Sequence, residues 1–164
     1  MRRTLLTALI WVFSSVIVLA EQPAPLLERF AGEWSAEGVA FGAPAQSRMI
    51  WSPALGGKFA RIDYRIEMAR ESGPAVFEGV GYYQLGDGET LQAFWSDNSG
   101  DLHPIRAERE GEALISHWGV EGGKQGRTRY ELLLSGDLQV TDWIRTSEGW
   151  RQFNQSTFTR RQEE

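Results

Sequence analysis

Short segments separated by glycine-containing turns make up the chain after Gly32. Almost every turn carries a glycine, which supplies the positive φ that a tight hairpin needs. The segments show no helical period and are rich in the aromatic residues that strands favour, with 7 Trp, 8 Phe and 4 Tyr in the chain. We therefore predict ten β-strands, over residues 33–41, 45–52, 58–69, 75–84, 90–97, 101–109, 113–121, 126–134, 138–146 and 151–160.

The shortness of the connections determines how these strands pair. Strands joined by a few residues must run antiparallel to their neighbours along the chain. A flat sheet built this way would leave two unpaired edges and an apolar face that no helical segment is long enough to cover, whereas closure removes both problems. We predict an all-β fold, a single antiparallel up-and-down barrel of about ten strands with a short N-terminal helical turn.

Alternation of apolar and polar residues supports half-buried strands. Within 58–69 the apolar face carries Ala60, Ile62, Tyr64, Ile66 and Met68, and the opposite face carries Arg61, Asp63, Arg65 and Glu67. The segment 138–146 departs from this pattern, because Asp142 shares a face with Leu138, Val140 and Ile144.

The N-terminal residues resemble an export signal. A basic start at Arg2 and Arg3 precedes an uncharged run over 4–20, and Val18 and Ala20 suit a signal peptidase. We predict a signal peptide over 1–20, cleaved near Ala20, and a periplasmic or secreted protein. The alternative is an uncleaved anchor, although about 17 residues is short for a membrane span.

The remaining residues divide into three parts. Residues 21–31 are predicted to be a linker and a helical turn, with Leu26, Leu27 and Phe30 on the side that closes one end of the barrel. The barrel is predicted over 32–161, and 162–164 form a polar tail.

Charge and composition exclude several function classes. A formal net charge of -5 argues against nucleic acid and anionic membrane surfaces as partners, so we expect membrane contact only through an uncleaved leader. The chain has no Cys, and its two His and scattered carboxylates lack metal-ligand spacing, so no metal site is predicted. No Gly-x-Ser-x-Gly elbow is present, and no catalytic residue is predicted. The sequence indicates no particular oligomeric state.

The stretch from Leu27 to Gly38 resembles the opening of a calycin. Lipocalins begin with a helical turn and Gly-x-Trp, which Gly32 and Trp34 match. Nitrobindin-like haem-binding barrels begin with Gly-x-Trp-x-Gly-x-Gly, where Ala36 replaces the first following glycine. Residues 51–59, 77–83 and 95–100 resemble a group of bacterial lipocalin-like domains. The resemblance implies a calycin-like barrel in which Arg160, or its neighbour Arg161, stacks on Trp34.

The same resemblance suggests ligand-binding residues. Fatty-acid-binding calycins hold a ligand carboxylate with inward Arg and Tyr side chains. By this comparison the candidates are Arg48 and Arg127, with Tyr64 and Tyr82 as phenolic partners. Most other strand arginines are expected on the outer face beside acids.

The nitrobindin-like pattern also implies haem held by one histidine, and haem is the one cofactor that the sequence raises. His117 lies within a predicted strand and is the candidate ligand. The alternative is an outward His117, because Leu114, Ser116 and Trp118 would share the opposite face. We expect His103 at the surface.

Three hypotheses for function follow. The first is a periplasmic or secreted binding protein for a small apolar or amphipathic ligand. The second is a filled barrel with a structural or interaction role in the cell envelope, which predicts no cavity and an exposed apolar patch at one rim. The third is a haem-binding barrel or an enzyme that uses His117. The sequence does not identify a ligand.

Overall fold

The computed structural model describes residues 25–86, 88 and 90–161, so the predicted signal peptide and the polar tail lie outside the described residues. All ten predicted strands are present, with ends that differ by a few residues from the prediction. After helix α1 (Leu26–Phe30), the strands are β1 (Gly32–Ala40), β2 (Ala43–Ala54), β3 (Phe59–Met68), β4 (Ala75–Gln84), β5 (Thr90–Asp97), β6 (Leu102–Glu110), β7 (Ala113–Gly119), β8 (Gln125–Leu132), β9 (Leu138–Thr146) and β10 (Gly149–Arg160).

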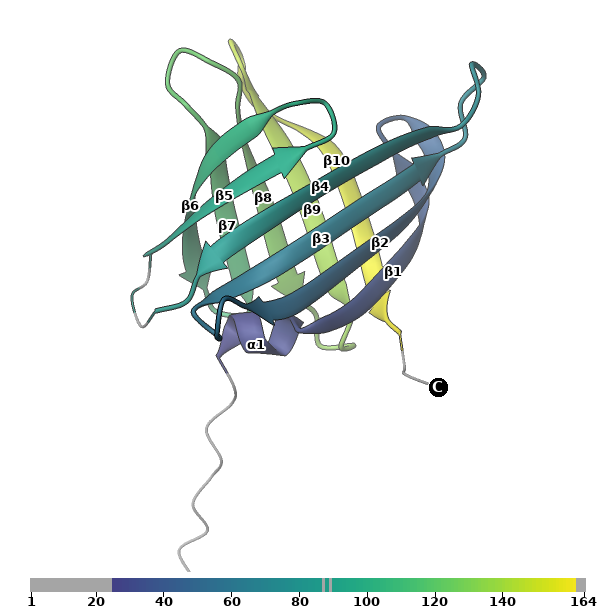
Figure 1. Ribbon diagram of the computed structural model, residues 1–164. Coiled ribbons are helices and arrows are strands. Elements are labelled where there is room, and N and C mark those ends of the chain that lie inside the picture. Colours follow the sequence, from purple (N-terminus) through teal and green to yellow (C-terminus); the bar gives the residue numbers. More distant parts are fainter. Residues whose placement is uncertain (1–24, 87, 89, 162–164) are drawn as a thin grey trace, which may run out of the picture.

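The strands form one closed antiparallel barrel, as predicted (Figure 1). Each strand pairs with the next along the chain, and β1 pairs with β10 to complete the ring. The β1–β10 ladder is short, with Trp34 opposite Arg160 and Ser35 opposite Thr159. The closure therefore depends on a small seam next to α1.

The β1–β2 turn is tighter than the sequence indicates. We predicted a connection over 42–44, but β2 begins at Ala43 and Pro44 pairs with Val39. The turn consists of Phe41 and Gly42, with φ of 49° and 78°. Two successive positive φ values match the twist of a hairpin, which allows the shorter turn. Phe41 is unusual there, because positive φ is unfavourable for a large side chain.

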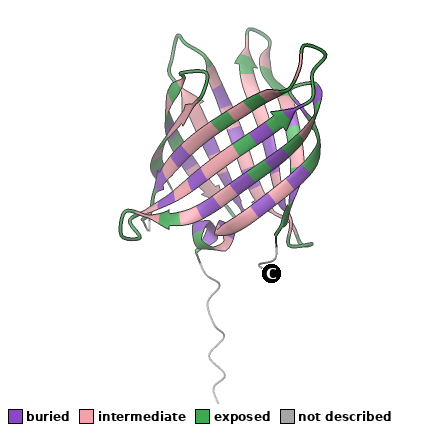
Figure 2. Ribbon diagram, turned by 45° about the vertical axis from the view of Figure 1, so that its right-hand side comes forward, coloured by how far each residue is buried: buried purple, intermediate pink, exposed green. Residues whose placement is uncertain are grey.

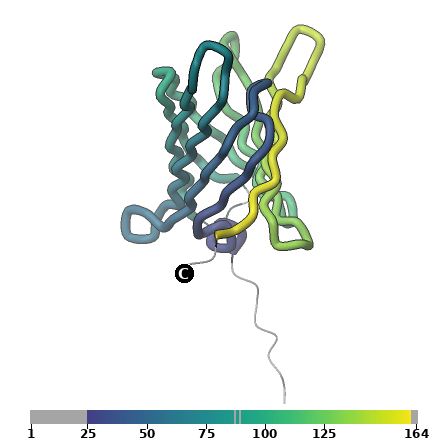
Figure 3. Tube along the Cα trace, turned by 90° about the vertical axis from the view of Figure 1, so that its right-hand side faces the viewer, coloured from purple at the N-terminus to yellow at the C-terminus, as the bar shows by residue number. Residues whose placement is uncertain are grey.

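Helix α1 closes one end of the barrel, as predicted (Figures 1 and 3). Leu26, Leu27 and Phe30 are buried against the core, and Trp34 Nε1 donates a hydrogen bond of 2.7 Å to the Phe30 carbonyl. The Arg160 guanidinium lies 4.2 Å from the centre of the Trp34 ring and donates to the carbonyls of Arg29, at 2.6 Å, and Ala31. This is the stacking that the lipocalin resemblance implies for Arg160.

The apolar core lies inside the barrel and against α1. Burial alternates along the strands, so inward and outward residues alternate in Figure 2. On β3 the buried face includes Ala60, Ile62, Ile66 and Met68, as the sequence predicts. The largest fully buried side chains are Trp34, Trp51, Tyr83, Phe30 and Phe158. No helix in the described part of the chain is long and apolar enough to span a membrane.

Candidate functional site

The half of the barrel opposite α1 contains a cavity of about 350 Å³. Residues from the turns at the end of the barrel that α1 does not cover line its mouth. Eight aromatic side chains line it: Phe41, Tyr64, Phe77, Tyr83, Trp95, Trp118, Tyr130 and Phe153. The core fills the other half, so the cavity is a pocket and not a channel.

Strand glycines make room for the two tryptophans of this wall. A Cβ at Gly79 of β4 would lie 2.0 Å from the ring of Trp95, and one at Gly126 of β8 would lie 1.9 Å from the ring of Trp118. Glycine within a strand commonly marks such a close approach. Each indole therefore lies against the backbone of the neighbouring strand and leaves the centre of the barrel open.

A polar cluster interrupts the aromatic wall at Asp142 of β9. Thr128 on β8 donates its hydroxyl to Asp142 Oδ1 at 2.6 Å, and Asn154 on β10 donates its amide to Oδ2 at 2.8 Å. The Thr128 hydroxyl in turn accepts a hydrogen bond of 3.3 Å from Trp118 Nε1. The two neighbouring strands thus fix the carboxyl group of Asp142 in place.

Burial raises the pKa of Asp142 above its ordinary value, and the hydrogen bonds from Thr128 and Asn154 oppose that rise only in part. Asp142 lines the cavity and is only partly shielded from solvent, because the cavity itself admits water-sized groups. The carboxyl group is therefore inside the barrel but accessible to a small molecule that enters from the mouth.

Three tyrosines complete the deep part of the cavity. Tyr83 Oη and Ser116 Oγ are hydrogen-bonded at 3.0 Å. The Tyr64 hydroxyl is buried without a hydrogen-bond partner among the described residues, and Ser47 approaches it without hydrogen-bond geometry. Burial raises the pKa of Tyr83 to about 12 and also raises the pKa values of Tyr64 and Tyr130. All three phenols are therefore neutral at physiological pH.

The mouth carries charges of both signs. Lys124 Nζ lies 3.2 Å from Asp101 Oδ2, and His103 Nε2 lies 3.5 Å from the same oxygen. Asp97 accepts hydrogen bonds from Trp95 Nε1 at 3.1 Å and from the Ser99 backbone at 3.0 Å. A ligand entering the barrel passes these groups before it reaches the aromatic wall.

Of the four predicted ligand-binding residues, Tyr64 lines the cavity and three lie on the outer wall. Arg48 forms a two-pronged ion pair with Glu33, at 2.8 and 2.7 Å. Tyr82 stacks on Phe94 with ring centres 5.3 Å apart. The Arg127 guanidinium lies between two outer indoles, 4.6 Å from Trp143 and 5.1 Å from Trp150. Arg48, Tyr82 and Arg127 therefore have no place in this cavity, because strand alternation directs them away from it.

The two histidines lie on opposite faces of the barrel wall, His117 outside and His103 inside. Ser116 and Trp118 line the cavity, so the intervening His117 lies on the outer face of β7. The expectation of a surface His103 is wrong, because β6 directs residues 103, 105 and 107 inward. The side chain of His103 is 15% exposed, and its ring centre lies 5.3 Å from that of Trp118.

The residues that sequence reasoning missed did leave signals. Asp142 stands out as an acid on an apolar strand face, and no ligand role was predicted for it. Gly79 lies within a predicted strand and Gly126 begins one, and an indole approaches each of these glycines. Thr128 and Asn154 gave no signal, since their importance depends on cross-strand contact with Asp142.

Within the described ranges, no three His, Cys, Asp or Glu side chains come together in a way that could hold a metal ion. In comparisons with known proteins, no family model matches the sequence, and no match was found among curated proteins. The case for a function therefore depends on the geometry of the cavity.

Proposed function

We propose that this protein binds a small amphipathic ligand inside the barrel. The observation that carries the proposal is the aromatic-walled cavity of about 350 Å³, closed at one end by α1 and open at the other. Pockets for small molecules are mainly apolar with a few placed polar groups, and volumes of about 300–1,000 Å³ are typical. Asp142 and Tyr64 supply the polar groups here.

The alternatives have less support. A filled envelope barrel predicts no cavity, whereas this barrel has one. Apolar side chains are exposed around the mouth, among them Val39 and Phe41 at 63% and 41%, so a rim contact with another molecule is compatible with ligand binding. A haem held by His117 would require an inward side chain at that position, and its neighbours Ser116 and Trp118 occupy the inner face.

Two finer expectations belong to the same proposal. The stacking of Arg160 on Trp34 above a helical turn supports a calycin-like, and specifically lipocalin-like, barrel. We also propose a periplasmic or secreted location, on the basis of residues 1–20. The intact mass of protein from a periplasmic extract tests the location, with loss of about 20 residues expected; a full-length mass in the cytoplasmic fraction would contradict it.

Tryptophan fluorescence provides a direct test of binding. We would titrate the protein with octylamine, octanol, octanoate and their phenyl counterparts, 2-phenylethylamine, 2-phenylethanol and 3-phenylpropanoate. At least one of these six probes should change the tryptophan fluorescence in a saturable way, because Trp95 and Trp118 line the cavity.

Variants locate the response. Trp118→Phe should reduce the fluorescence change, whereas Trp143→Phe on the outer wall should leave it intact. If neither fluorescence nor calorimetry detects saturable binding of any of these probes, the proposal is wrong.

A further inference from the structure

The charges within the barrel are arranged by depth. At the mouth, His103, Lys124 and Arg151 line the cavity together with two acids, Asp97 and Asp101. The ionisable carboxyl group deeper inside is Asp142. A fatty-acid site would require the reverse arrangement, with an inward arginine at depth. The cavity thus disfavours a ligand that carries its carboxylate inward.

The hydrogen-bonding capacity of the deep wall points in the same direction. Thr128 donates its hydroxyl hydrogen to Asp142, and Asn154 donates one of its two amide hydrogens. The Tyr64 hydroxyl, which lines the cavity, is buried without a partner among the described residues and can accept or donate a hydrogen bond. A ligand group that donates hydrogen bonds would satisfy this hydroxyl, and leaving it unpaired is unfavourable.

The aromatic rings around Asp142 suit a cation. Tyr64, Tyr83 and Tyr130 line the same cavity as Asp142. The faces of such rings attract ammonium groups, and recognition of organic cations by aromatic cages uses this attraction. An ammonium between the rings and Asp142 would also form an ion pair shielded from bulk water.

We propose that the cavity selects amines, with the ligand's ammonium bound to Asp142 and its apolar body against Trp95, Trp118 and Phe77. This proposal rests on the ligand-binding function proposed above and names its substrate class. The net charge of -5 favours the approach of such cations. A primary ammonium donates hydrogen bonds, and the Asp142 carboxylate and the Tyr64 hydroxyl, which both line the cavity, can accept them.

Calorimetry with shape-matched probes tests this directly. The unmodified protein should bind octylamine and 2-phenylethylamine at least tenfold more tightly than octanol and 2-phenylethanol. Octanoate and 3-phenylpropanoate should bind more weakly than the alcohols. This comparison needs no variant, so it does not depend on whether a mutant folds.

Two variants then assign the preference to one carboxyl group. Asp142→Asn keeps the shape and should abolish the amine preference while alcohol binding persists. Asp63→Asn removes the same charge from the outer wall, where Asp63 pairs with Arg61, and should leave the preference unchanged.

The outcomes separate the two proposals. Equal binding of amine and alcohol, or tighter binding of the acids, would overturn amine selection while leaving a ligand-binding barrel. A preference that survives in Asp142→Asn would also overturn it. Absence of binding by every probe would overturn both proposals.

Discussion

The indole of Trp118 lies directly against the backbone of Gly126 on the neighbouring strand, so that a Cβ at position 126 would lie 1.9 Å from the ring. No side chain other than hydrogen fits between them. The cavity therefore depends on a glycine, because a displaced Trp118 would move into the space that a ligand would fill.

Gly126→Ala should force Trp118 out of its position and lower the free energy of unfolding by about 1–3 kcal/mol, as overpacking usually does. Near-UV circular dichroism should change with the environment of the indole, and urea denaturation gives the stability. Gly38→Ala is the matched control, since nothing lies within 4 Å of a Cβ at that strand position. A Gly126→Ala protein indistinguishable from the control would contradict this packing.

Arg160 joins β10 to the helix that closes the barrel. It stacks on Trp34 and donates to the carbonyls of Arg29 and Ala31. Arg160→Ala should reduce the free energy of unfolding by about 1–2 kcal/mol, through loss of the stacking and of charged hydrogen bonds. Arg161→Ala, which loses an exposed ion pair with Glu33, should have a smaller effect. Equal urea midpoints for the two variants would argue against a special role for Arg160.

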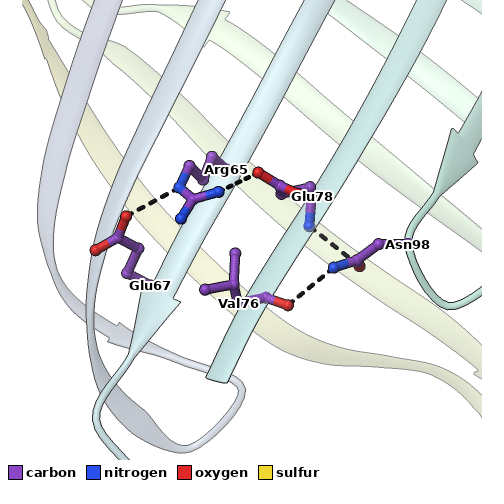
Figure 4. A network of polar contacts seen from close by, with 5 residues as sticks. All are labelled: Arg65, Glu67, Val76, Glu78 and Asn98. Atoms are coloured by element: carbon purple, nitrogen blue, oxygen red, sulfur yellow. Dashed lines mark hydrogen bonds and ion pairs between the residues drawn. The ribbon is translucent and has the colours of Figure 1, made fainter. Parts of the chain in front are cut away.

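The outer face of β4 carries a network in which one amide matters more than the ion pairs (Figure 4). Asn98 accepts a hydrogen bond from the Glu78 backbone at 3.2 Å and donates to the Val76 carbonyl at 3.0 Å, so it pairs with β4 beyond the end of β5. Asn98→Ala should lose about 1 kcal/mol of stability. Arg65→Gln breaks exposed ion pairs with Glu67 and Glu78 and should cause no measurable loss. The reverse order of urea midpoints would refute this ranking.

Glu33 makes stability depend on pH in the acid range. Hydrogen bonds from Arg48 and Arg161 lower its pKa from 4.5 to about 2. A lowered native pKa stabilises the fold above the unfolded pKa, and this contribution is lost as the pH falls from 4.5 toward 2. Glu33→Gln should therefore be less stable than the unmodified protein at pH 6, and the difference should shrink at pH 3. Glu71→Gln in an exposed turn serves as the charge control. A difference that stays constant across this range would contradict the assignment.

Asp142 should change stability with pH in the direction opposite to Glu33. Burial raises its pKa, so the folded state favours the protonated carboxyl group, and stability falls as the pH rises from 3.8 through the raised pKa. Asp142→Asn removes this effect, so the variant should gain stability relative to the unmodified protein as the pH increases. Thermal denaturation of the two ligand-free proteins at a series of pH values from 3.8 upward would measure this difference in stability. If the stability of Asp142→Asn relative to the unmodified protein instead falls with increasing pH, Asp142 is not buried as described.

Much of the architecture was predictable, because the pattern that specifies it is local. Glycine-bearing turns specify hairpins, and hairpins in succession specify antiparallel neighbours. The inward face of β3 was also predictable, because Ile62, Tyr64 and Ile66 alternate with charged residues. The β1–β2 turn was predicted too long, since nothing in the sequence indicated that Phe41 adopts a positive φ.

The candidate site was less predictable where alternation is weak. Tyr82 and Tyr83 are adjacent aromatics, and only Glu78 and Gln84, which share a face with Tyr82, indicate which of them faces outward. Arg127 lies between Gly126 and Thr128, neither of which marks an apolar face. The direction of the Arg127 side chain follows from the register of β8 with β7 and β9.

The sequence by itself determined that the chain forms a closed barrel, because short connections and exposed strand edges allow few other solutions. The tertiary structure decided where the barrel is hollow and what surrounds the hollow. A cavity forms where side chains from strands distant in sequence fail to fill the interior, and that depends on the volumes and directions of all of them together. Asp142 shows the difference, since its chain position revealed an acid on an apolar face but only the folded barrel brought Thr128 and Asn154 to its two oxygens.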